Sequence, residues 1–196
     1  QFDHARSLNR LAVLDQKTGN NDAARTGLAE SWALLDRLKD SKKHDVEVQR
    51  TITLLAGNLC AMDALGEAVT DETLVWCASA TDVGAKLAQV EGPASLDPYN
   101  LAFNLMWESE ALEQSGDAAK ATERRRNALT LSERLMAENP DNRKIASQRM
   151  EILGFLSERY GLDDQITMMT EAIIIAERLV TMDPAQEERK QKLEYY

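Results

Sequence analysis

The sequence predicts an all-α fold, and three observations support this prediction. Ala, Leu, Glu, Arg and Lys make up 92 of the 196 residues, a composition typical of long helices. Apolar residues recur at spacings of three and four, as one face of a helix requires. The prolines lie at the ends of these periodic segments, because proline lacks a backbone donor and stops a helix: Pro93, Pro98, Pro140 and Pro184.

The first half of the chain contains four predicted helices. Leu8, Leu11 and Leu14 give the first its apolar face, and the polar break at Gly19 ends it. The second has the same periodicity, and Gly66 separates the third from the fourth. We expect these helices over residues 2–18, 22–40, 45–66 and 71–90.

The second half contains four more predicted helices and a last helical piece. Leu101, Leu105 and Leu112 give the fifth its periodicity, and Gly116 ends it. Asp117 and Asp163 can accept backbone hydrogen bonds at the starts of later helices. These helices are expected over residues 97–115, 118–139, 142–160 and 164–182, with the last piece over 185–196.

The helices form an internal repeat of about 45 residues. Ala128–Pro140 and Ala172–Pro184 are offset by 44 residues, and seven of their thirteen positions are identical or similar. The preceding turns also correspond, since each begins at a glycine: Gly19, Gly116 and Gly161. Gln49-Arg50 and Gln148-Arg149 form another pair of matching positions, 99 residues apart. A fixed repeat of this kind is typical of stacked helical hairpins.

The repeat resembles tetratricopeptide repeats, in which a Gly-Asp turn joins two helices and a proline follows the second. Small residues stand where the helices of such a hairpin approach each other: Ala12, Ala24, Ser31, Ser109, Ala121, Ala128, Gly154 and Ala172. The helices are longer than in the usual 34-residue repeat, and the large aromatic residue late in the first helix is missing. The chain is therefore most similar to the divergent long-helix repeats appended to bacterial signalling proteins.

The resemblance implies a right-handed α-solenoid of about four antiparallel hairpins. These would span residues 2–40, 45–90, 97–139 and 142–182, with a C-terminal helix over 185–196. We treat residues 1–196 as one helical repeat domain. Because the chain starts at Gln1 without a methionine, we expect it to be a fragment of a larger protein.

Negative charge is concentrated in residues 61–115. This segment has ten acidic residues and one basic residue, Lys86, while the whole chain carries a net charge of −10. The segment is either a solvated acidic face or a docking surface for a basic protein segment. The acidic balance argues against a nucleic-acid partner, and no apolar run is long enough to predict insertion in a membrane.

Four residues of the fifth predicted helix form a candidate binding surface. If the repeat register holds, Phe103, Met106, Glu110 and Glu113 lie on the groove face of this helix. Apolar anchors beside carboxylates would suit a basic amphipathic peptide. The alternative is that Phe103 and Met106 pack against the neighbouring hairpin.

Cys60 and Cys77 are equidistant from the turn between the third and fourth helices. Helix axes usually lie about 8–10 Å apart, whereas a disulfide needs Cα atoms within about 7 Å. We therefore expect two buried free thiols. A disulfide is the alternative, and it would imply an oxidising compartment.

No sequence motif indicates catalysis or a cofactor. The chain has no glycine-rich phosphate loop, no HExxH and no GxSxG, and its two histidines are isolated. We expect a protein that is not an enzyme, without cofactor or metal, acting as a protein-binding scaffold or adaptor. The alternatives are an extracytoplasmic ligand-sensing domain of a membrane-anchored regulator and an oligomerisation module. Cytoplasm and periplasm both fit the sequence.

Overall fold

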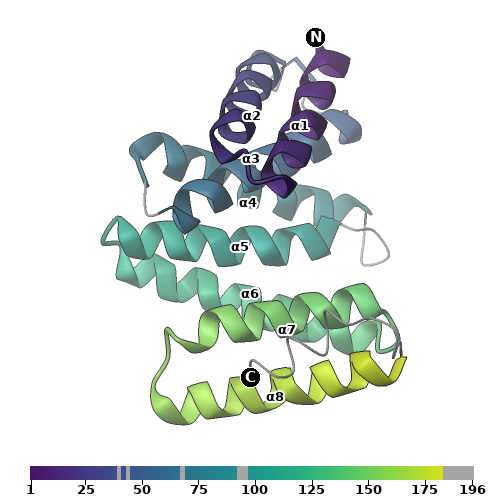
Figure 1. Ribbon diagram of the computed structural model, residues 1–196, viewed down its shortest axis with the longest axis vertical. Coiled ribbons are helices and arrows are strands. Elements are labelled where there is room, and N and C mark those ends of the chain that lie inside the picture. The colour runs from purple at the N-terminus through teal and green to yellow at the C-terminus, as the bar shows by residue number, and fades with distance from the viewer. Residues whose placement is uncertain (39–40, 43–44, 67–68, 92–96, 183–196) are drawn as a thin grey trace. The chain divides into compact units, whose positions relative to one another are not determined.

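The computed structural model describes residues 1–38, 41–42, 45–66, 69–91 and 97–182. Within these residues the chain forms eight α-helices and no strand, so the all-α prediction is confirmed (Figure 1). None of the helices in these ranges combines the length and apolarity needed to cross a bilayer. The predicted C-terminal helix 185–196 lies outside the described residues. The helices are α1 Phe2–Lys17, α2 Asn21–Asp36, α3 Val46–Leu65, α4 Asp71–Glu91, α5 Asp97–Gln114, α6 Ala118–Glu138, α7 Arg143–Ser157 and α8 Leu162–Met182.

Helices that are consecutive in the chain pack against each other. The chain divides into two compact units, residues 1–124 and 125–196. In the first unit α1 packs on α2, α2 on α3, α3 on α4 and α4 on α5, and α3 also contacts α5. In the second unit α7 packs on α8. This nearest-neighbour packing is compatible with a helical repeat.

The turn after α1 has the same backbone geometry as the turn after α5. Gly19 and Gly116 have φ angles of 82° and 89°, in the left-handed region that favours glycine. The next residue donates to a carbonyl five positions back in both turns, from Asn20 to Asp15 at 2.8 Å and from Asp117 to Leu112 at 2.9 Å. This is the Schellman arrangement that ends a helix. The predicted correspondence is confirmed for the turns at Gly19 and Gly116, but not for the third turn, because Gly161 does not have a positive φ.

Small residues allow α1 and α2 to pack closely. Ala12, Ala24 and Ser31 are buried, as the repeat predicts. A methyl group added to Gly27 would lie only 3.3 Å from the Cβ of Ala12, so the two backbones are near the limit of approach. Ser31 donates to the carbonyl oxygen of Ala5 at 2.8 Å, which satisfies its buried hydroxyl.

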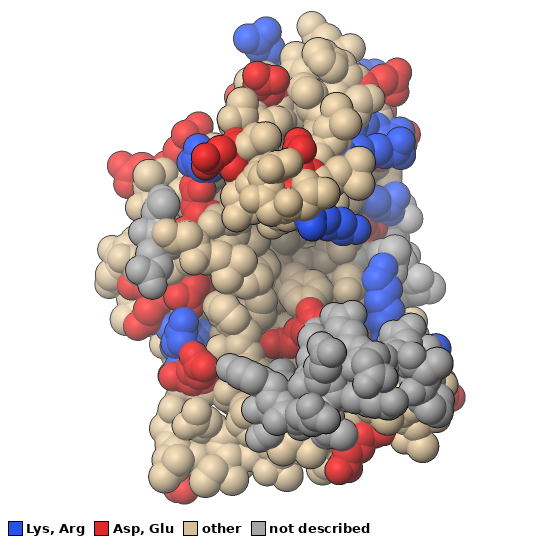
Figure 2. Space-filling model, viewed as in Figure 1, with Lys and Arg blue, Asp and Glu red and all other residues tan. Residues whose placement is uncertain are grey.

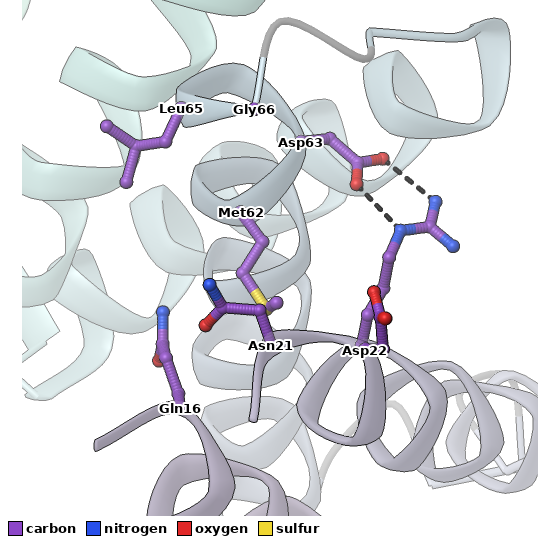
Figure 3. Close-up of a pocket in the computed structure, with 8 residues that line it drawn as sticks. Gln16, Asn21, Asp22, Met62, Asp63, Leu65 and Gly66 are labelled. Carbon is purple, nitrogen blue, oxygen red and sulfur yellow. Dashed lines mark hydrogen bonds and ion pairs between the residues drawn. The ribbon is translucent and has the colours of Figure 1, made fainter. Parts of the chain in front are cut away.

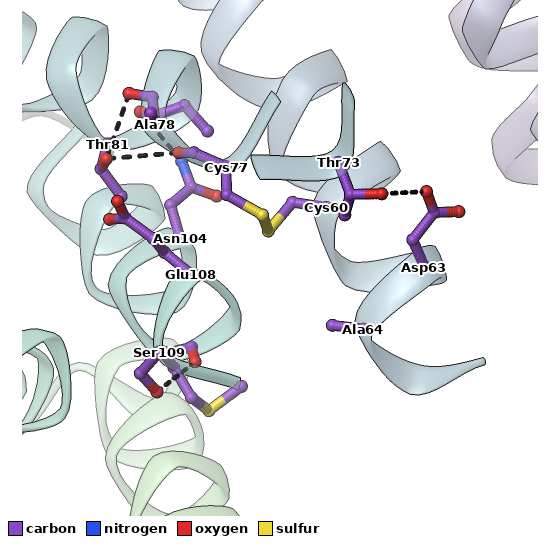
Figure 4. The surroundings of a disulfide bond; sticks show 12 residues. Cys60, Asp63, Ala64, Thr73, Cys77, Ala78, Thr81, Asn104, Glu108 and Ser109 are labelled. Atoms are coloured by element: carbon purple, nitrogen blue, oxygen red, sulfur yellow. Dashed lines mark hydrogen bonds between the residues drawn. A yellow bond between two sulfur atoms is a disulfide. The ribbon is translucent and has the colours of Figure 1, made fainter. Parts of the chain in front are cut away.

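The expectation that Cys60 and Cys77 are free thiols is wrong, because they form a disulfide between α3 and α4 (Figure 4). Their Cα atoms are 5.0 Å apart, much closer than a typical spacing of helix axes. The two helices approach this closely because a small residue, Gly84, lies elsewhere along the same α3–α4 contact. A Cβ on the buried Gly84 of α4 would lie 3.3 Å from Cγ2 of Thr53 in α3.

Removal of the disulfide is expected to destabilise the first unit. Cys60 and Cys77 are separated by 17 residues, and closing a loop of about this length contributes about 3 kcal/mol. We predict that Cys60→Ala with Cys77→Ala lowers the free energy of unfolding by about this amount in urea denaturation. Equal stability of the variant and the oxidised protein would contradict the prediction.

The second unit has a core shared by α7 and α8. Its buried members are Ala146, Met150, Leu153, Ala172, Ile175, Ala176 and Leu179, and Leu129 and Met136 of α6 pack against it. Leu135 and Leu179 are both buried, as the repeat alignment predicts. The expected equivalence of Pro140 and Pro184 is not tested, since Pro184 lies outside the described residues.

A buried arginine joins α6, α7 and α8. Arg149 of α7 donates to both carboxylate oxygens of Glu171, at 2.9 and 3.1 Å. Its Nη1 also donates to the carbonyl oxygen of Leu129 and to Oγ of Ser132, at 2.7 and 2.9 Å. Arg149, which the repeat matches to Arg50, therefore holds three helices of this unit together.

Truncation of a core leucine tests this packing. Leu179 has no exposed surface, so Leu179→Ala leaves a cavity and is expected to lower the free energy of unfolding by roughly 2–5 kcal/mol. Leu162→Ala is the matched control, because Leu162 lies on the same helix but is 69% exposed. Comparable losses in the two variants, measured by urea denaturation, would contradict the packing described here.

Candidate functional site

The first unit contains a pocket of about 330 Å³ (Figure 3). Three helix ends form it: the last turn of α1, the first turns of α2, and the last turn of α3. Polar groups and two apolar side chains share its wall. The lining residues are Gln16, Asn21, Asp22, Arg25, Met62, Asp63, Leu65 and Gly66.

An ion pair between α2 and α3 forms one side of the pocket. The Arg25 Nε and Nη2 donate to the two carboxylate oxygens of Asp63, at 3.0 and 3.2 Å. The Asp63 side chain is 2% exposed, whereas that of Arg25 is 47% exposed. The hydrogen bond to Asp63 raises the pKa of Arg25, although burial opposes this shift. The Arg25 guanidinium carbon also lies over the Trp76 ring, 5.8 Å from its centroid, which is a cation–π contact.

The start of α4 holds Asp63 in place. Thr70 and Thr73 exchange hydrogen bonds between side-chain oxygens and backbone N–H groups, at 3.0 and 3.2 Å. The Thr73 hydroxyl then donates to Oδ2 of Asp63 at 2.7 Å (Figure 4). Cys60 lies one helical turn before Asp63, so the disulfide fixes the same pair of helices. The pocket wall is therefore built on a cross-linked part of the fold.

The surroundings of the pocket are negatively charged. Asp22 and Asp63 line it, and Glu72 lies close enough to Arg25 to raise its pKa. The residues that line the pocket thus include two carboxylates and one guanidinium, a net charge of −1, and Glu72 lies outside this lining. A cation at the pocket mouth would be attracted by this surplus.

The four residues predicted on the fifth helix lie on α5, with different exposures. Phe103 is half-buried and packs edge-on against Tyr99, with ring centroids 5.5 Å apart. Glu110 is half-buried and accepts a hydrogen bond from Gln114 at 3.2 Å, while Glu113 is exposed. Met106 is only 2% exposed, and this burial argues against a direct contact with a partner. Peptide binding by this set stays a prediction.

The end of α5 contacts the last turn of α3. The Gln114 side chain donates to the carbonyl oxygen of Ala64 at 2.7 Å. Ala64 immediately precedes Leu65, which lines the pocket. Glu110 and Glu113 therefore belong to the helix end that contacts the pocket wall.

Part of the negative charge of the acidic segment 61–115 is buried. Asp63, Asp97 and Glu108 are buried, and each pairs with an arginine from another helix. Arg50 binds Asp97 at 2.9 and 2.7 Å, and Arg124 lies 2.8 Å from Glu108. Figure 2 shows both acidic and basic side chains on the face that it draws. The surface charge of the segment is thus lower than its composition indicates.

The pocket and its ion pair were not predicted from the sequence. One signal was present: Asp63 is the only charged residue between Thr51 and Leu65, in a run that is otherwise uncharged. A single charge in such a helix is often buried and paired. The partner could not be identified from the sequence, because Arg25 is 38 residues away and on another helix.

Comparisons with known proteins assign no family to the chain. No family model matches it, and no curated protein matches it significantly. Among the residues that the structure describes, no group of three or more His, Cys, Asp or Glu could hold a metal ion. The functional assignment therefore depends on the geometry above.

Glu108 is expected to make stability depend on pH. Burial raises its pKa above the ordinary value, and the nearby Arg124 opposes this shift. The folded protein therefore takes up this proton at a higher pH than the unfolded chain. The contribution of Glu108 to the free energy of unfolding rises as the pH falls through its folded-state pKa, and levels off below the unfolded value.

Glu108→Gln tests this effect because the variant cannot titrate. We predict that wild type gains thermal stability relative to Glu108→Gln as the pH is lowered from 7 to 5. Thermal unfolding followed by circular dichroism at several pH values measures the difference. The opposite trend would show that the ion pair with Arg124 outweighs the cost of burial.

Proposed function

We propose that this chain is a non-catalytic helical repeat domain that binds a basic segment of a partner protein. The matching Schellman turns, the small residues between α1 and α2 and the nearest-neighbour packing support a tetratricopeptide-like array. In this proposal the hairpins are antiparallel and the array is a right-handed solenoid. The domain would act as a scaffold or adaptor in a larger, signalling protein.

The observation that carries the proposal is the pocket with its surplus of carboxylates. Met62 and Leu65 offer apolar surface, and Asp22, Gln16 and Asn21 offer oxygen atoms. A lysine or arginine side chain has this dual character, since its aliphatic stem packs on apolar surface and its charged head stays among polar groups. The volume of about 330 Å³ is at the small end for ligand pockets, and suits one long side chain.

Glu110 and Glu113 extend the proposed surface beyond the pocket. Both belong to the end of α5 that hydrogen-bonds to α3 through Gln114 and Ala64. A peptide with several basic residues could place one side chain in the pocket and others near these carboxylates. Exposed charges of this kind mainly raise the association rate, and salt screens them.

A fluorescent peptide with alternating glycine and lysine residues is a direct probe. Asp22→Asn is expected to weaken its binding about two- to fivefold, as an exposed ion pair is worth up to about 1 kcal/mol. Asp163→Asn is the matched control, because Asp163 is also an exposed aspartate in the first turn of a helix. Fluorescence anisotropy gives both affinities.

The proposal also requires that binding weakens as salt rises, and that a peptide with glutamine in place of lysine does not bind. Equal affinities of the two aspartate variants would reject the pocket as the binding site. Affinity that is indifferent to salt would reject a basic partner.

The disulfide favours a related second function, that of an extracytoplasmic ligand-sensing domain. Disulfides form and persist in oxidising compartments, and Cys60 and Cys77 are both buried. In that case the pocket would take a small cationic ligand instead of a peptide side chain. Free lysine and a lysine peptide, compared on the same protein, distinguish these functions by which of them binds more tightly.

A further inference from the structure

The disulfide lies close to the pocket along both of the helices that it joins. On α3, Cys60 precedes all the residues that the end of this helix contributes to the pocket lining. On α4, Cys77 comes one helical turn after Thr73, whose hydroxyl donates to the pocket residue Asp63 (Figure 4). The covalent bond and this hydrogen bond therefore connect the same turns of α3 and α4.

The Asp63 carboxylate needs α4 for one of its hydrogen bonds. It is 2% exposed and accepts from Arg25 and from Thr73. Arg25 belongs to α2 and Thr73 to α4, so a movement of α4 away from α3 breaks the Thr73 bond first. A buried carboxylate that loses a donor is destabilised, and the pocket wall that contains Asp63 is loosened as a result.

The surroundings of the two sulfur atoms leave little room for separated thiols. Cys60 and Cys77 are buried in a cluster with Ala64 and Ala111, and Trp107 packs against this cluster. Two thiol sulfurs cannot approach each other as closely as two bonded sulfurs, and a close-packed interior has no free space to absorb the difference. Cleavage of the bond therefore moves the end of α3 and the start of α4 apart.

Both cysteines are near a helix end, which gives a reductant a route to them. α3 ends at Leu65, five residues after Cys60, and α4 begins at Asp71, six residues before Cys77. Helix ends open locally at a low cost in free energy. A small reductant can therefore reach the sulfur atoms while the rest of the unit stays folded.

We propose that the pocket is redox-sensitive: reduction of the bond between Cys60 and Cys77 releases the end of α3 from α4 and weakens the binding of a basic ligand. This inference rests on the proposed function of the pocket. In the reaction a dithiol supplies two electrons and two protons, so the sulfur–sulfur bond breaks, each cysteine becomes a thiol, and the dithiol becomes a disulfide. In the reduced protein only a fraction of the molecules keeps an ordered pocket wall, and the apparent affinity falls by that fraction.

The affinity of the full chain for the glycine-lysine peptide is measured before and after complete reduction with dithiothreitol. Fluorescence anisotropy should show about fivefold weaker binding to the reduced protein. The chain has two cysteines, so maleimide labelling followed by mass spectrometry reports only this bond. Cys60→Ala with Cys77→Ala is the control for the reductant, because dithiothreitol cannot change its affinity.

Thr73→Val tests how the disulfide is linked to the pocket. This variant has already lost the hydrogen bond to Asp63, so reduction should change its affinity by at most about twofold. Thr81→Val is the matched control, since Thr81 is also buried on α4 but donates to the carbonyl oxygens of Cys77 and Ala78. It should keep the fivefold difference, and equal responses of the two variants would overturn the proposed link.

Hydrogen exchange without peptide separates this inference from the proposed function. Reduction should accelerate exchange at residues 62–66 and leave residues 172–179 of the second unit unchanged. Equal exchange in the two forms, or a bound peptide whose affinity does not respond to reduction, would overturn the inference. Loss of the helical circular dichroism signal would also overturn it, because the change would then be global. A peptide that binds neither form would instead reject the proposed function, and the exchange rates would still decide whether the disulfide controls the pocket wall.

Discussion

The structure depends on one constraint: a single pair of helices leaves an apolar face that only a neighbouring helix can cover. In the first unit this requirement links α1 to α5 through a series of contacts between successive helices. Close approach at these contacts needs small residues, and Ala12, Gly27 and Gly84 supply them.

Charges at these contacts are stabilising only when they are paired. Asp63, Asp97 and Glu171 each bind an arginine from another helix, and the pairs join elements that are distant in the sequence. A buried charge that loses its partner is costly, so these pairs restrict the arrangements that neighbouring helices can adopt. Around Asp63 the carboxylates outnumber the arginine. The ion pair that stabilises the fold therefore leaves negative charge at the pocket, and the proposed basic partner would bind to it.

The sequence was sufficient to predict the helices and several of their contacts, because these depend on local patterns. Gly19 and Gly116 end helices, and Ala12, Ala24 and Ser31 lie at a close contact, as predicted. The disulfide was not predicted, since the 5.0 Å approach of the cysteines depends on Thr53 and Gly84 packing at another level of the same helices. The pocket was not predicted either, because it forms where the end of α3 meets the turn between α1 and α2, and Asp63 is 38 residues from Arg25 in the sequence.

The most direct measurement of the central claim is a titration of ¹⁵N-labelled protein with the glycine-lysine peptide, followed by NMR. Binding at the pocket will concentrate the chemical-shift changes at the backbone amides of residues 21–25 and 62–66, which line it. These changes should diminish when salt is added, because the attraction is between charges. Changes spread evenly over the chain, or concentrated on α8, would show that the peptide does not bind at the pocket.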